Sequence, residues 1–126
     1  MMDENGVSRV VLGAALEVHR ALGPGLLESV YQHALAHEIR LRGLECEKEV
    51  PIAAGYKGIR FDCAYRADLL VEGAVMVEIK AVDMLSPAHS AQLLSYLRLS
   101  GCRLGILINF NMPLLRQGIK RVVNNL

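Results

Sequence analysis

The stretch "DLLVEGAVMVEIK", Asp68 to Lys80, places three charged residues among apolar, strand-forming ones. Side chains alternate along a strand, so Glu78 and Lys80 should share one face, about 7 Å apart. The segment "EGA", residues 72–74, is short enough to join two strands as a hairpin. We therefore expect the hairpin to bring Asp68 to the same side as Glu78 and Lys80.

Three charged groups on an apolar hairpin have two explanations. Two carboxylates a few ångströms apart repel each other unless a cation lies between them. Oxygen ligands with room for water suit Mg²⁺ or Mn²⁺, and a neighbouring lysine would assist an attacking water or neutralise a phosphate. Alternatively, Glu78 and Lys80 lie on a solvated outer face and Asp68 closes a salt bridge there.

The segments before the hairpin predict two helices. Apolar residues recur at helical spacing over Val7–Leu22, and Gly and Pro in "LGPG" end this helix. A second helix is expected from about Leu26 to Arg42, with Glu28 in its first turn. Its inward stripe comprises Leu27, Val30, Tyr31, Leu35 and Ile39.

Strand patterns follow the second helix. Residues 45–54 predict an edge strand, because Pro51 cannot donate to a ladder. Residues 59–71 alternate, which should turn Ile59, Phe61 and Cys63 toward the core, and Cys63 is expected to be a small buried hydrophobe. Residues 103–110 are almost wholly apolar, as in a central strand, and residues 118–123 predict a last short strand.

A third helix should cover residues 87–100, because Ser86 suits the N-cap, Pro87 the first helical position and Gly101 the C-terminal end. The predicted order is thus α, α, β, β, β, α, β, β. It indicates an α/β (α+β) fold in which helices flank a mixed central sheet, and 126 residues suit one domain, 1–126.

Composition limits the partners. The formal net charge is +1, so any nucleic-acid partner must be met by a local basic patch. The basic cluster is Arg116, Lys120 and Arg121, which could contact phosphates or form a solvated face. Three widely spaced cysteines indicate reduced thiols and a cytoplasmic location, and the chain has no apolar run long enough to span a membrane.

The pattern D-x(9)-E-x-K across two strands, followed by a helix and an apolar strand, resembles the core of the PD-(D/E)xK nuclease superfamily. The segment "GLLESVY", Gly25 to Tyr31, resembles the motif of the GxxExxY family, which is assigned to that superfamily. The similarity extends from about Val10 to Val123. It implies a restriction-endonuclease-like core and a divalent-metal-dependent nuclease, with DNA as the expected substrate.

By position, the resemblance makes Asp68 and Glu78 the metal-binding carboxylates and Lys80 the catalytic lysine. It also implies that Glu28 reaches the metal, although Glu28 could simply complement the helix macrodipole. Gln92 resembles the first residue of a Q-x(3)-Y helix element beside the active site, or it is a surface amide. Tyr96 and His89 share its stripe, and Ala67 replaces the proline of the "PD" pair.

The expected cofactor is Mg²⁺ or Mn²⁺ and the expected partner is nucleic acid. A rival interpretation is a catalytically silent module of the same fold that binds nucleic acid or a protein partner. A homodimer through the helical faces is a third. His33 and His37, four residues apart, could hold zinc in principle but are expected to be solvated, because a third ligand is missing nearby in the sequence. Tyr31 is expected to pack, with its hydroxyl hydrogen-bonded.

Overall fold

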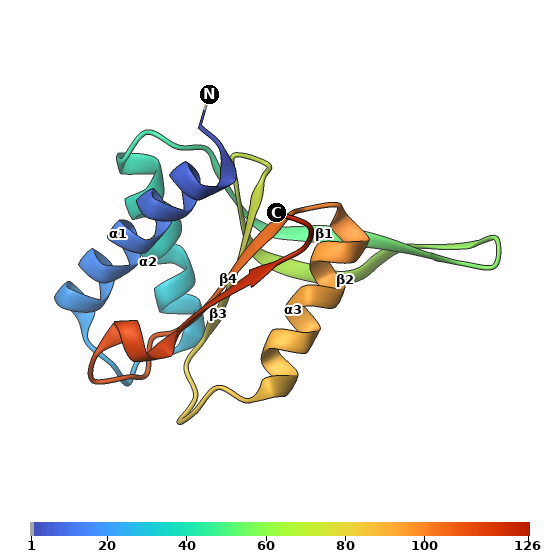
Figure 1. Ribbon diagram of the computed structural model, residues 1–126. Helices are drawn as coiled ribbons and strands as arrows, with labels where there is room; N and C mark the ends of the chain where they lie inside the picture. The colour runs from blue at the N-terminus through green and yellow to red at the C-terminus, as the bar shows by residue number, and fades with distance from the viewer. Residues whose placement is uncertain (1) are drawn as a thin grey trace.

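The computed structural model describes residues 2–126, and its centre is one mixed sheet of five strands (Figure 1). The strands lie in the order β1-β2-β3-β4-β5; β3 and β4 are parallel and the other pairs are antiparallel. The strands are β1 (Cys46–Tyr56), β2 (Ile59–Val71), β3 (Val75–Lys80), β4 (Leu104–Asn109) and β5 (Ile119–Val123).

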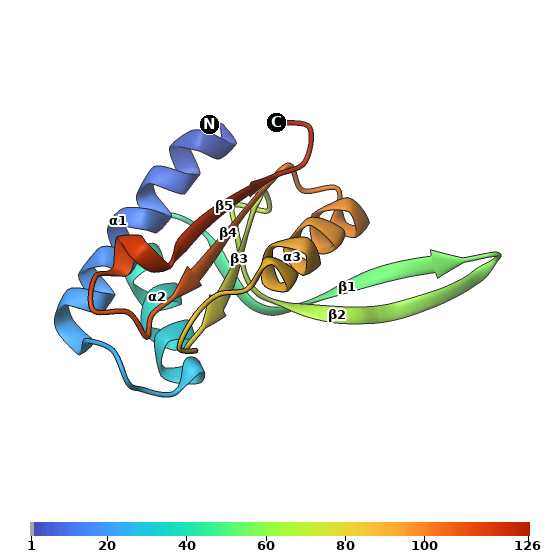
Figure 2. The same ribbon diagram turned by 60° about the horizontal axis from the view of Figure 1, so that its bottom comes forward.

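Helices cover both faces of the sheet. Helices α1 (Glu4–Leu22) and α2 (Glu28–Leu41) lie on one face, and α3 (Pro87–Ser100) lies on the other (Figures 1 and 2). A short 3₁₀ helix, η1 (Leu115–Gly118), precedes β5. This arrangement confirms the predicted fold class and order of elements, and β1 is an edge strand as expected from Pro51. Among the described residues, none of the helices has the length and hydropathy that a membrane-crossing segment requires.

Each face of the sheet has its own apolar core. The larger core fills the space between the sheet and the α1–α2 layer, and the smaller core lies under α3. Strand β4 is buried along its whole length, as its apolar sequence predicted. The smaller core consists of Ile52, Ala67, Met76, Leu93, Leu97, Cys102 and Leu107.

The ends of α3 confirm the sequence prediction. Ser86 is the N-cap, Pro87 begins the helix, and the Ser86 amide donates a hydrogen bond to His89 Nδ1 at 3.0 Å. Gly101 ends the helix in the left-handed region, with φ of 78°, where glycine avoids a side-chain clash.

The start of α2 differs from the prediction. The helix begins at Glu28, and Leu27 is an extended N-cap whose side chain is 74% exposed. Val30 is 40% exposed, so the predicted inward stripe is wrong at Leu27 and Val30. The preceding loop instead wraps around Tyr31, whose hydroxyl donates to Gly23 O at 2.6 Å and accepts from the Leu26 amide at 3.1 Å.

The tip of the β1–β2 hairpin projects beyond the rest of the molecule (Figure 2). We call residues 55–64, all of which are exposed, the arm. Lys57 and Gly58 form its two-residue turn with φ of 45° and 85°, which suits a tight hairpin. The predicted burial of Ile59, Phe61 and Cys63 is therefore wrong, because this half of the hairpin lies outside the layers that the helices cover.

Candidate active site

Strands β2 and β3 separate at Asp68. Their ladder runs from Val71–Val75 to Leu69–Val77 and does not continue to the next residues. Instead, the Asp68 side chain accepts a hydrogen bond from the Ile79 amide through Oδ2 at 2.8 Å, and the Asp68 amide donates to Glu78 Oε1 at 3.4 Å. Each carboxylate is thereby bonded to the backbone of the other strand at the fork between them.

Burial and mutual repulsion act on this carboxylate pair. Glu78 is 8% exposed, and burial followed by the charge of Asp68 raises the pKa of Glu78 to about 8. Burial also raises the pKa of Asp68, and the nearby carboxylates of Glu28 and Glu49 add to this effect. At neutral pH, Glu78 therefore retains its proton unless a cation lies beside the pair.

Glu78 and Lys80 face α3 across a hollow of about 200 Å³, which we call the Lys80 hollow. Gln92 and Tyr96 of α3 line it from the other side, as the sequence analysis placed them. The complete lining is Tyr65, Arg66, Glu78, Lys80, His89, Gln92, Leu93, Tyr96 and Leu107.

Asp68 opens into a different hollow from Lys80. This second hollow, of about 230 Å³, is lined by Glu28, Ser29, Gln32, Glu49, Asp68 and Ile79, and we call it the Glu28 hollow. Asp68 and Lys80 therefore line different hollows, and Glu78 lines the same hollow as Lys80. Asp68 and Glu78, which are joined by a hydrogen bond, each line one of the two hollows.

The solvated salt bridge considered from the sequence is not present. Glu78 is buried and Lys80 is half-buried. Within residues 2–126, the four salt bridges all involve arginine, and none includes Asp68, Glu78 or Lys80. Glu78 is thus buried and Asp68 half-buried, and neither forms a salt bridge within the described residues.

Two tyrosines form one wall of the Lys80 hollow. The rings of Tyr65 and Tyr96 stack with centroids 3.4 Å apart and an interplanar angle of 16°. The Tyr65 hydroxyl donates to the sulfur of Met76, which fixes the ring over the smaller core. Gln92 lies beside them and is exposed, so its amide is available to a ligand. His89 also lines the hollow, but its Nδ1 is already used at the start of α3.

The sequence analysis missed Gln32 and Glu49. Gln32 is buried, and its Nε2 donates to Glu49 Oε1 at 2.7 Å and to Asp68 O at 3.0 Å. Glu49 lies opposite Asp68, between the paired residues on either side, and has φ of 54°. The register of the β1–β2 pair shifts between Ile52 and Ala54. Counting residues back from the hairpin turn would therefore not have placed Glu49 opposite Asp68.

Asn109 anchors the segment that follows Lys80 by hydrogen bonds. Asn109 is the last residue of β4 and is fully buried. Its Nδ2 donates to Val82 O at 2.8 Å and its Oδ1 accepts from the Val82 amide at 3.0 Å. A single polar residue at the end of an apolar strand was the available sequence signal.

Other predicted residues are more dispersed. Lys120 and Arg121 are consecutive on β5 and so point to opposite faces. Lys120 lines a hollow with the start of α3, Arg121 bonds to Asn5, and Arg116 is exposed on η1, so the predicted basic cluster is not one patch. His33 and His37 are exposed, and His33 Nδ1 lies 2.8 Å from the Lys48 ammonium.

The donor set at the fork fits a hard divalent cation. Mg²⁺ commonly takes one or two carboxylates and completes its shell with water and substrate phosphate. Asp68 and Glu78 supply two carboxylates, one half-buried and one buried, whose mutual repulsion a cation would relieve. Within residues 2–126, no three histidine, cysteine, aspartate or glutamate side chains converge closely enough to hold a metal by themselves.

The fold and the fork between β2 and β3 define a nuclease-like core. The family model of the PD-(D/E)XK nuclease superfamily matches residues 5–122, and the chain belongs to this superfamily. A solved chain titled "Crystal structure of SSO0001" is similar with 20% sequence identity and a TM-score of 0.46, over 95% of this chain and 66% of that chain. This chain therefore spans just under two thirds of the length of that one. A comparison with curated proteins finds no significant match.

Proposed function

We propose that the chain hydrolyses phosphodiester bonds of nucleic acid, with DNA as substrate, using a divalent cation held by Asp68 and Glu78. The observation that carries this proposal is the hydrogen bond that joins half-buried Asp68 to buried Glu78 beside Lys80, with neither carboxylate in a salt bridge within residues 2–126. Two neighbouring carboxylates with restricted access to water are costly to keep ionised, and a cation offsets that cost. Membership of the nuclease superfamily supports the same chemistry.

Mg²⁺ or Mn²⁺ bound at this pair would supply electrostatic stabilisation of the charge that grows on the phosphate. The Ile79 amide orients Asp68, and contact with Asp68 orients Glu78. Glu28 lines the Glu28 hollow with Asp68, and in this proposal its charge adds to the negative potential that attracts the cation. The "GLLESVY" segment that contains Glu28 places the chain, in this proposal, in the GxxExxY group.

Lys80 and Gln92 serve the substrate in this proposal. Lys80 extends into the Lys80 hollow from β3, where its ammonium can neutralise a phosphate oxygen and orient a water. Gln92 faces it from α3 and can donate its amide hydrogens to the same phosphate. The site therefore has a cation-binding side at the fork and a phosphate-binding side at α3.

Cleavage of labelled single-stranded, nicked and duplex DNA with Mg²⁺ or Mn²⁺ tests the proposal. We expect the Lys80→Ala variant to cut at least about a hundredfold more slowly, the usual loss when one transition-state donor is removed. An Arg9→Ala variant is the matched control, because Arg9 is an exposed cation on α1 and should leave cleavage unchanged. Equal cleavage by wild type and Lys80→Ala would refute the role of Lys80.

A catalytically silent module is the second candidate, and a specific observation favours it. The carboxylates of Asp68 and Glu78 already have hydrogen-bond partners, and a proton on Glu78 would remove their repulsion without any metal. Calorimetric titration with Mg²⁺ separates the candidates, because a silent module should give no heat that depends on Asp68. Light scattering would show whether such a module works as a homodimer or needs a protein partner.

A further inference from the structure

We propose that the arm and the end of α3 capture a single-stranded segment of the nucleic acid; this inference rests on the proposed function. A hollow of about 610 Å³ lies where the arm approaches α3, and we call it the arm hollow. Its lining includes three cations, Lys57, Arg60 and Arg98, together with the ring of Tyr56, and it contains no carboxylate. This combination matches phosphate and base rather than an apolar ligand.

The charge of this surface differs from that of the whole chain. All 13 acidic residues lie at or before Asp83, so α3 and everything after it contain none. Lys57 and Arg98 have no salt bridge within residues 2–126, and among the cations of the arm hollow only Arg60 is paired, with Asp62. Cations such as Lys57 and Arg98, which are outside any salt bridge within residues 2–126, are the electrostatic footprint expected for a polyanion.

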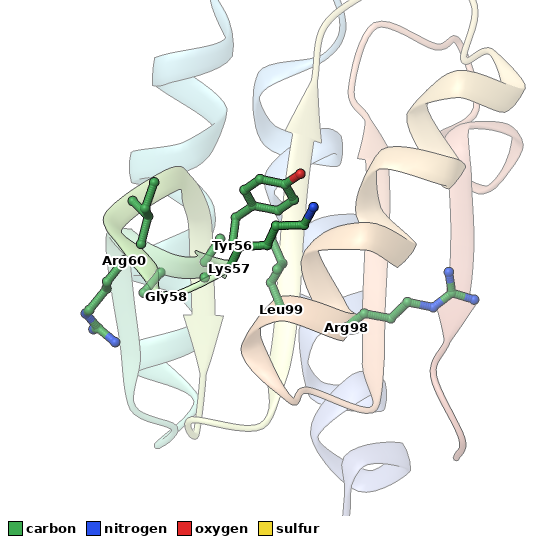
Figure 3. Close-up of a pocket in the computed structure, with 10 residues that line it drawn as sticks. Tyr56, Lys57, Gly58, Arg60, Arg98 and Leu99 are labelled. Carbon is green, nitrogen blue, oxygen red and sulfur yellow. The ribbon is translucent and has the colours of Figure 1, made fainter.

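The arm also presents rings and apolar side chains to solvent. Tyr56 pairs across the hairpin with Ile59, and Ala54 with Phe61, so these side chains lie on one face of the ribbon. Tyr56 is 60% exposed and Phe61 is 50% exposed. The Lys57 ammonium lies 5.4 Å from the centre of the Tyr56 ring, which places a charge beside a stacking platform. Figure 3 shows Arg60 and Arg98 directed outward on opposite sides of Tyr56 and Lys57.

Helix α3 connects the arm hollow to the Lys80 hollow. Arg98 is in its last turn, and Gln92 and Tyr96 are two turns or less before it. Six residues of helix separate Gln92 from Arg98, a rise of about 9 Å. A strand that stacks at the arm can therefore reach the phosphate-binding side of the site within a few nucleotides.

Single-stranded nucleic acid fits this surface better than a duplex or a second copy of the chain. Base faces are free to stack on Tyr56 and Phe61 only where the strand is unpaired, and every base offers such a face. A protein interface centred on the same rings would bury Lys57, whereas lysine is depleted at protein interfaces. The occupant we infer is thus an unpaired strand, such as a flap or an overhang.

Fluorescence anisotropy with a labelled oligothymidylate tests this inference. An oligothymidylate of about 20 nucleotides is several times longer than the smallest binding site for single strands, which is about 4 nucleotides. The full-length protein is used with a chelator, so binding is measured without cleavage. We expect Tyr56→Ala to weaken binding about tenfold, the loss typical of one stacked base, and Tyr56→Phe to retain binding. Arg98→Ala should lower the slope of log Kd against log salt by about 0.7.

The matched control is Arg9→Ala, which removes an exposed cation from the opposite face of the sheet and should change neither Kd nor the salt slope. Equal effects of Arg98→Ala and Arg9→Ala would overturn the inference, as would tighter binding of the matched duplex. A dimer that is detected by sedimentation and that Tyr56→Ala dissociates would also overturn the inference. If Tyr56→Ala weakens binding but the protein cleaves no substrate, the proposed nuclease activity is contradicted and the inference about binding is not.

Cys63 provides a second readout that does not depend on a variant. It is exposed on the arm, whereas Cys46 and Cys102 are buried. We expect the oligothymidylate to slow alkylation of Cys63 by a maleimide and the matched duplex to leave its rate unchanged. An alkylation rate that saturating oligothymidylate leaves unchanged would contradict binding at the arm.

Discussion

The two halves of β2 have similar sequences and opposite surroundings. Leu69 and Val71, in the second half, are fully buried between helices and neighbouring strands. Ile59 and Phe61, in the first half, continue the same apolar alternation, yet 58% and 50% of their surface is exposed. Alternation therefore identifies a strand without showing what covers it, and the change from covered to uncovered falls close to Asp68.

The largest expected effect is on the buried half. Leu69→Ala removes a fully buried side chain from the larger core and should lower the free energy of unfolding by about 2–5 kcal/mol. Urea denaturation followed by circular dichroism measures the change. A loss below about 1 kcal/mol would mean that this half of β2 is less well covered than the structure indicates.

The next effect concerns the fork at which the two halves meet. Folding raises the pKa of Glu78 from its ordinary value of 4.5 to about 8, so between these values the folded state holds a proton that the unfolded chain releases. Without metal, stability should therefore fall as pH rises from about 4.5 to 8, by up to about 1.4 kcal/mol per pH unit. Glu78→Gln should lack this contribution, and parallel pH profiles of the two proteins would contradict the raised pKa.

Added Mg²⁺ should oppose this loss of stability at pH 8. At a concentration about five times Kd, a cation bound by Asp68 and Glu78 would stabilise the folded state by about 1 kcal/mol. Thermal unfolding measures the gain, which Asp68→Asn should abolish. Glu47→Gln, which removes an exposed carboxylate from β1, is the control and should keep the gain. An equal gain in Asp68→Asn would locate the cation elsewhere.

The smallest effect is expected in the exposed half. Ile59→Ser should change the free energy of unfolding by less than about 0.5 kcal/mol, because the side chain lies on the projecting arm. Its amides should also exchange hydrogen faster than those of β3 and β4. A large loss of stability in Ile59→Ser would show that something covers the arm, and concentration-dependent stability would identify a second copy.

Much of the fold could be predicted because local patterns coincided with the tertiary structure. Ser86, Pro87 and Gly101 mark the ends of α3 by backbone preferences that need no distant partner. The apolar run of β4 reflects burial on both faces, and Pro51 indicated the edge position of β1. The exposure of Leu27 and Val30 was missed because the loop before α2 folds around Tyr31, a contact that periodicity does not report.

Less of the candidate site than of the fold could be predicted from the sequence. Glu78 and Lys80 share a strand, so their common orientation follows from alternation alone. The orientation of the Asp68 side chain depends on where the β2–β3 ladder stops, and the position of Glu49 opposite Asp68 depends on a register shift between β1 and β2. Both are irregularities of strand pairing, and strand pairing is set by contacts between distant residues.

The amide of Asn109 has a consequence for the width of the Lys80 hollow. By bonding to both backbone groups of Val82, it extends the β3–β4 pairing by one step with a side chain in place of a strand. The chain that leaves Lys80 for α3 is therefore tethered to the most deeply buried strand. An incoming strand would meet a preassembled slot of set width, while the arm outside it is exposed along residues 55–64.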